Sequence, residues 1–184
     1  MFERFTREAR EVVEGAVAHA ERAGAGTITD EHMLLALLDL RTGRVAGVLT
    51  ILALDRETVV REMAEARRRG GLSQADEAAL AGLGIDVGEV VARIEGTHGE
   101  GAMADERGGV GRRLLRLAGH RPFAPTAKDT LAKALRIATG RGDRQIGGEH
   151  MLLALAARPG VAQDVLAGQG AGYADVERVL RQAA

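Results

Sequence analysis

Apolar residues in the first third of the chain recur with the spacing of one helix face. They predict a helix over residues 7–23 that ends at Gly24 and Gly26, since glycine is common where helices stop. A second helix is expected to begin after Thr29 or Asp30 and to contain the heptapeptide EHMLLAL of residues 31–37. The pattern then predicts a short helix over 45–53 and a fourth that runs from Asp55 to about Arg69.

The same heptapeptide returns at residues 149–155, and the pattern around it returns as well. A shift of 118 places Phe5 on Phe123 and Ile28 on Ile146. The second copy predicts helices over 125–139, 148–157, 161–168 and 174–182. We therefore expect an all-α fold, a pseudo-two-fold tandem repeat of two four-helix units that pack as one domain.

A longer segment separates the two units, so we divide the chain into 1–69, an insert of 70–121, and 122–184. Part of this insert, residues 80–94, resembles the second half of the unit. A shift of 31 lays Leu80 on Leu49 and Val90 on Val59, which predicts an extra helix-turn-helix. The glycine-rich run from Gly96 to Gly111 predicts a flexible loop.

The amino-acid composition excludes several kinds of site and partner for this fold. Hydrophobic residues make up 46% of the chain and aromatic residues 2%, which predicts an aliphatic core. The absence of cysteine excludes disulfides and thiolate metal sites. A charged start and the lack of a long apolar run predict a cytoplasmic protein with no membrane partner. The net charge of −1 gives no general attraction to nucleic acid, so no nucleic-acid partner is expected.

The adjacent Glu and His of the heptapeptide invite a catalytic interpretation, which the spacing does not support. A zinc helix needs a second histidine about one turn away, and that position holds Ile28 or Ile146. Ser73 is the single serine, and no Gly-Lys pair exists to form a phosphate-binding loop. We predict a protein without enzyme activity, metal or cofactor, in which His32 and His150 are partly buried imidazoles that bridge helices and MLLAL is core.

The opening FERFTREAREVVEGAVAHAERAG, followed by ITDEHMLLALL and later by IGGEHMLLAL, resembles the N-terminal (Clp N) domain of the Clp AAA+ unfoldases, of the ClpC type. The resemblance covers residues 1–69 and 122–182. It implies a stand-alone Clp N-like protein, or an excised piece, that lacks the ATPase modules. Its implied role is to bind protein or peptide substrates, or adaptors, for a ClpC-type unfoldase.

The resemblance also implies one phosphoarginine pocket in each repeat. The first would use Glu31 with the hydroxyl of Thr6, and the second Glu149 with Thr126, because Ala124 stands where the family hydroxyl is expected. A carboxylate accepts a forked pair of hydrogen bonds from a guanidinium, and a helix start can hold the phosphoryl group.

A second function remains open on the same resemblance. Phe2, Phe5 and Phe123 correspond to an aromatic surface between the repeats of the family. This surface implies a scavenger or decoy that binds cyclic peptide antibiotics directed at the ClpC N-terminal domain.

Overall fold

The computed structural model describes residues 2–69, 71–99 and 121–182, and helices dominate all three ranges. A 3-10 helix, η1 (Phe2–Arg4), precedes the first unit: α1 (Arg7–Arg22), α2 (Asp30–Leu38), α3 (Arg44–Ile51) and α4 (Arg56–Arg68). Two helices follow, α5 (Gln74–Gly82) and α6 (Val87–His98). The second unit is α8 (Pro125–Gly140), α9 (Gly148–Ala157), α10 (Val161–Gly168) and α11 (Tyr173–Gln182).

These helices confirm the predicted all-α tandem repeat with an extra helix-turn-helix between the units. One boundary was wrong. The loop predicted to begin at Gly96 begins later, because α6 continues to His98 and ends before Gly99, whose φ is 94°. The remainder of that predicted loop, residues 100–111, lies outside the described residues.

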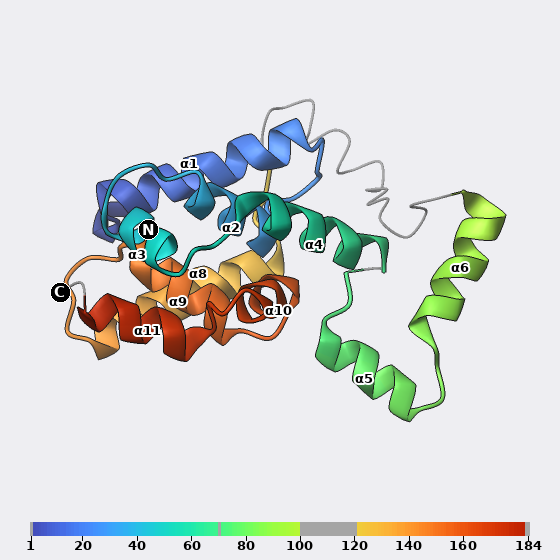
Figure 1. The fold of residues 1–184 in the computed structure, drawn as a ribbon. Helices are drawn as coiled ribbons and strands as arrows, with labels where there is room; N and C mark the ends of the chain where they lie inside the picture. The colour runs from blue at the N-terminus through green and yellow to red at the C-terminus, as the bar shows by residue number, and fades with distance from the viewer. Residues whose placement is uncertain (1, 70, 100–120, 183–184) are drawn as a thin grey trace.

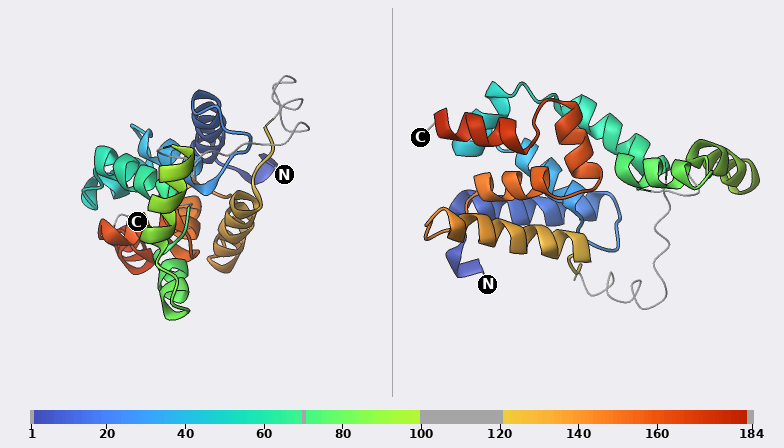
Figure 2. Two further views of the ribbon diagram at one scale, coloured as in Figure 1. Left: turned by 90° about the vertical axis from the view of Figure 1, so that its right-hand side faces the viewer. Right: turned by 90° about the horizontal axis from the view of Figure 1, so that it is seen from below.

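The two units interlock around α2 and α9, which pack against each other at the centre. Helix α1 covers α2 and α8 covers α9 on one side, and the second halves of the units lie on the other side (Figures 1 and 2). There α3 packs on α11 and α4 packs on α10. Both of these contacts join a helix of one repeat to a helix of the other.

The centre of this packing is aliphatic, as the composition predicted. Leu152, Leu153 and Leu155 of α9 are at most 1% exposed, and Leu34 and Leu37 of α2 are fully buried. Burial of one such side chain stabilises the fold by about 1.5–3 kcal/mol. The repeated MLLAL letters are therefore a packing requirement of the two central helices.

Short backbone pairings join the start of each unit to the other unit. The N–H of Thr6 donates to the carbonyl of Ile146 at 3.0 Å, and the N–H of Ala124 donates to that of Ile28 at 2.8 Å. The chain entering α1 thus lies against the loop before α9, and the chain entering α8 lies against the loop before α2. This crosswise pairing determines which side chains meet.

The pair α5–α6 projects from the body (Figure 1). Its base is held where the N–H of Gln74 donates to Asp164 Oδ2 at 2.7 Å and where Ser73 is buried. Among the described residues, no helix has the length and apolar character needed to span a membrane.

Candidate functional site

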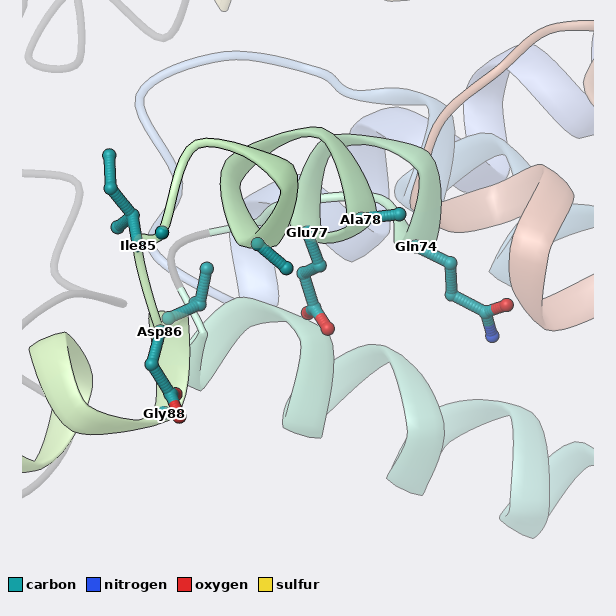
Figure 3. Close-up of a pocket in the computed structure, with 9 residues that line it drawn as sticks. Gln74, Glu77, Ala78, Ile85, Asp86 and Gly88 are labelled. Atoms are coloured by element: carbon teal, nitrogen blue, oxygen red, sulfur yellow. The ribbon is translucent and has the colours of Figure 1, made fainter.

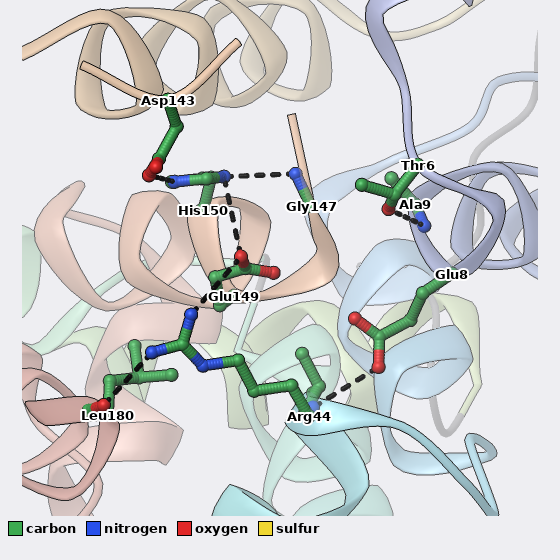
Figure 4. Close-up of polar contacts among 10 residues, drawn as sticks. Thr6, Glu8, Ala9, Arg44, Asp143, Gly147, Glu149, His150 and Leu180 are labelled. Atoms are coloured by element: carbon green, nitrogen blue, oxygen red, sulfur yellow. Dashed lines mark hydrogen bonds and ion pairs between the residues drawn. The ribbon is translucent and has the colours of Figure 1, made fainter. Parts of the chain in front are cut away.

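The crosswise pairing groups the candidate residues differently from the sequence prediction. The N–H of Thr6 pairs with the carbonyl of Ile146, so Thr6 lies beside the start of α9, the helix that carries Glu149 (Figure 4). The carbonyl of Thr126 instead shares the Arg158 guanidinium with Asp30 at the start of α2. We call these two places the Glu149 end and the Glu31 end. The predicted pairs, Thr6 with Glu31 and Thr126 with Glu149, are exchanged because each entering segment pairs with the other repeat.

At the Glu149 end the candidate carboxylate is already near a cation of the chain. Glu149 is the second residue of α9, and its side chain is 15% exposed. Arg44, at the start of α3, approaches Glu149 Oε1 with Nη1 at 3.8 Å and donates from Nη2 to the Leu180 carbonyl at 3.0 Å (Figure 4). An arginine of the first repeat therefore lies over the glutamate of the second.

Glu8 joins two helix starts at the same end. Its Oε1 accepts the N–H of Val45 at 3.2 Å, and its carboxylate also accepts the N–H of Gly148. Burial is the main cause that raises the pKa of Glu8; the Glu149 carboxylate also raises it, and the two backbone donors oppose the shift. A Cβ on Gly148 would lie 2.9 Å from both Glu8 Oε2 and Val45 Cγ2, so the carboxylate needs glycine there.

Thr6 caps its own helix. Its Oγ1 accepts the N–H of Ala9 at 3.1 Å, which satisfies one of the unpaired donors in the first turn of α1. A hydroxyl that accepts in this way still has a proton to donate. The Thr6 hydroxyl therefore keeps one donor that the cap does not use.

The Glu31 end has the same backbone arrangement as the Glu149 end but different charged side chains. Glu31 is the second residue of α2, is 16% exposed, and forms an ion pair with Arg67 Nε of α4. Arg158 Nη1 contacts Asp30 Oδ2 at 3.3 Å, the Thr126 carbonyl at 2.7 Å and Thr130 Oγ1 at 2.9 Å. Thr126 thus contributes its carbonyl here, and the residue is exposed.

Asp30 is a second, partly buried carboxylate of this end. Burial raises its pKa, while Thr130 and Arg158 oppose the rise. Its Oδ1 is buried without a hydrogen-bond partner among the described residues. The charged form of Asp30 is therefore favoured first by Thr130 and then by Arg158.

The histidine of each Glu-His pair has a structural role at the start of its helix. His32 Nδ1 accepts the N–H of Thr29 at 3.0 Å, and His150 Nδ1 accepts the N–H of Gly147 at 2.9 Å. Each imidazole is 2% exposed and reaches back over the start of its own helix, where glutamate or glutamine stands in a capping box. We expected imidazoles that bridge helices; these bonds are to the N-terminus of the helix that carries the histidine.

The outer nitrogens of these imidazoles differ. His150 Nε2 lies 2.9 Å from Asp143 Oδ2, whereas His32 Nε2 is buried with no hydrogen-bond partner in the described ranges. Burial, together with the positive charge of Arg67 and the nearby His19, lowers the pKa of His32 to about 4.

Two of the three aromatic side chains predicted to form a peptide surface are turned away from solvent. Phe5 is 3% exposed and belongs to the core, and Phe123 is partly buried against it. The reason is the crosswise pairing, which bridges Phe5 to Ile146 and Phe123 to Ile28. The side chain of Phe2 lies outside the described residues.

Sequence reasoning missed three charged residues of these ends: Glu8, Arg44 and Arg67. Glu8 stands in a charged first turn and Arg67 in a run of three arginines, and both patterns are typical of solvated helix ends. No local signal identifies their distant partners. Among the described residues, no three acidic or histidine side chains lie close enough to hold a metal.

Comparison with known proteins places this arrangement in a family. The sequence profile of the Clp repeat (R) N-terminal domain matches residues 4–82 and 122–184. The chloroplastic ClpA homolog of Brassica napus and the chloroplastic chaperone ClpC1 of Arabidopsis thaliana are each 30% identical over 183 residues. These matches cover 98% of this chain but only 16% and 15% of the two relatives.

Solved structures show the same fold. The Hsp104 N-terminal domain from Candida albicans matches with a TM-score of 0.56 and 14% identity, covering 97% of this chain and 89% of that one. The N-terminal domain of ClpD from Arabidopsis thaliana matches with a TM-score of 0.53 and 18% identity, covering 99% and 98% of the two chains.

Proposed function

Because the chain belongs to the Clp repeat N-terminal domain family, we propose that it is a non-catalytic recognition module for the substrates or adaptors of a Clp-type chaperone system. We propose further that it selects arginine side chains, phosphoarginine above all, at the Glu31 end. ATP-driven unfolding belongs to other modules, since no Gly-Lys pair is present in these residues.

One observation carries the proposal: an arginine of the chain already lies beside the candidate glutamate at each end. Arg67 pairs with Glu31 and Arg44 approaches Glu149. A carboxylate about 15% exposed at a helix start, with an arginine that is roughly 40% exposed, is a guanidinium site from which the occupant can exchange. Exposed ion pairs contribute only about 0–1 kcal/mol, so a ligand arginine with further contacts can displace the internal one.

The Glu31 end suits phosphoarginine better than the Glu149 end. At the Glu149 end the Glu8 carboxylate already accepts the N–H of Gly148, where a phosphoryl group would have to bind. At the Glu31 end the position equivalent to Glu8 is Thr126, and the Arg158 guanidinium lies nearby as a donor for phosphoryl oxygens.

Calorimetric titration with free phosphoarginine tests this assignment. Glu31→Gln should weaken binding by about tenfold or more, whereas the matched variant Glu149→Gln should stay within about twofold of the wild type. Arg67→Ala should tighten binding several-fold, because it removes the internal competitor. Absence of heat at millimolar ligand, or equal loss in both glutamine variants, would overturn the assignment.

Free arginine and inorganic phosphate, titrated separately, show which half of the ligand is recognised. The proposal expects arginine to bind weakly and to depend on Glu31. The aromatic peptide surface has no comparable support, since Phe5 lies in the core.

A further inference from the structure

The pair α5–α6 repeats the turn of the two hairpins that form the second halves of the units. Gly84 has a φ of 78°, and the equivalent Ala53 and Gly170 have φ values of 51° and 70°. The same hydrogen bond closes each turn: Ile85 to Leu80 at 2.9 Å, Leu54 to Leu49 at 3.2 Å, and Ala171 to Leu166 at 2.8 Å. The pair α5–α6 is thus a third copy of one hairpin form.

In the third copy, apolar positions that are buried in the other two hairpins are exposed to solvent. Val59 and Val176 are fully buried, while the equivalent Val90 is 41% exposed. Leu83 and Ile85 of the turn are 78% and 42% exposed. We call the exposed apolar side chains of this pair the α5–α6 surface; no described element covers it.

A pocket lies at the bend of the pair (Figure 3). Apolar and acidic side chains line it together, among them Glu77, Ala78, Ala81, Ile85, Asp86 and Val87. Glu77 is paired with Arg69 of α4 at 3.0 Å, and Asp86 caps α6. The pocket offers room for an apolar side chain beside acidic groups.

The charge of the α5–α6 pair indicates the charge of a partner that could bind its exposed surface. Residues 74–98 hold a single basic residue, Arg93, and five acidic ones: Asp76, Glu77, Asp86, Glu89 and Glu95. Two copies of this surface would repel each other, and a basic partner would be attracted.

The paired hairpins show the form of that partner. Helix α5 corresponds to α10, and α10 is covered by α4. Helix α4 buries Val59, Met63 and Ala66 and carries arginines at 56, 61, 67 and 68. The arginines of α4 stand beside three glutamates, and α11, which covers α3, the other equivalent of α5, carries two arginines and two acidic residues. In the chain itself, an amphipathic helix with arginines is what covers this hairpin form.

We infer that the α5–α6 surface is a docking site for an amphipathic helix with Arg or Lys beside its apolar stripe. The family profile matches residues 4–82 and 122–184, so α6 lies outside the matched ranges. The inference does not depend on arginine recognition at the Glu31 end.

A labelled peptide with the α4 sequence, DRETVVREMAEARRR of residues 55–69, is the probe, and fluorescence anisotropy with the full chain is the measurement. Ile85→Asp combined with Val90→Asp should weaken binding by about tenfold or more. The control Ile51→Asp changes an even more exposed apolar residue, in α3, and should stay within about twofold. Circular dichroism checks that all variants are folded.

A second peptide, with every arginine replaced by glutamate, should not bind. Three results would overturn the inference: no binding of the basic peptide, equal binding by all variants, or equal binding of the acidic peptide. Sedimentation of the chain alone adds a fourth: self-association that Ile85→Asp with Val90→Asp abolishes would assign the surface to a second copy.

Discussion

The Glu149 end and the Glu31 end have the same backbone arrangement but carry different side chains. Both use a parallel bridge between an entering segment and a loop, and both cap the following helix with a buried histidine. At the Glu149 end a partly buried acid, Glu8 of α1, lies opposite Gly148 of α9. At the Glu31 end a partly buried acid, Asp30 of α2, lies opposite Thr126 of α8.

The difference teaches that each end retains one partly buried carboxylate beside its glutamate but takes it from opposite sides of the interface. Glu8 is satisfied by backbone donors of two helices, and Asp30 by Arg158. Main-chain pairing depends little on side chains, so it can be the same at both ends while the acids exchange places.

Gly148→Val should have the largest effect, because its side chain would meet Glu8 and Val45 at a crowded point of the Glu149 end. We expect a loss of about 3 kcal/mol in the free energy of unfolding, measured by urea denaturation. Gly47→Val is the control: it adds the same side chain to α3 where no atom lies within 4 Å. Similar losses in both variants would contradict the crowding argument.

Acid should destabilise the Glu31 end through His32. Its pKa is about 4 when folded and about 6.5 when unfolded, so the unfolded chain binds the proton first. Stability from this group is complete above pH 6.5 and falls by about 1.4 kcal/mol per pH unit toward pH 4. His32→Gln keeps a capping side chain and should flatten this part of the pH dependence of unfolding.

Ala25→Asp sharpens the same comparison. Ala25 is equivalent to Asp143, the partner of His150, and both residues close their turns with the same backbone bond. A carboxylate there should raise the pKa of His32, which nuclear magnetic resonance titration measures. An unchanged His32 pKa would show that the two loops place their side chains differently.

Glu8→Ala should cost about 1–2 kcal/mol, since it removes one carboxylate from the starts of both α3 and α9. Thr126→Ala, the equivalent change at the Glu31 end, should cost less than about 0.5 kcal/mol because the residue is exposed. Equal losses in thermal or urea unfolding would indicate that the two ends share more than their backbone.

The smallest effects are expected for the arginines over the two glutamates. Arg67→Ala and Arg44→Ala should each change the free energy of unfolding by less than about 1 kcal/mol, and Arg44 by less, since its charged atoms lie 3.8 Å from Glu149. A loss above about 2 kcal/mol in either would mean that the arginine is structural and does not exchange.

The sequence alone determined the helices, the duplication and the core. Apolar spacing is a local property, so the bounds of α9 and α10 agree with the predicted 148–157 and 161–168. The repeated EHMLLAL likewise marked the two central helices. The turn of the third hairpin was also visible, because residues 80–94 repeat the letters that make the turn.

Only the tertiary structure decided which of these residues meet. The crosswise pairing that sets Thr6 against the loop before α9 and buries Phe5 depends on bridges between residues 141 and 95 positions apart, Phe5 with Ile146 and Ile28 with Phe123. The arginines beside Glu31 and Glu149 come from α4 and α3 for the same reason. Helix formation is encoded within a few turns of chain, whereas the chemistry of a site between two repeats depends on how the repeats interlock.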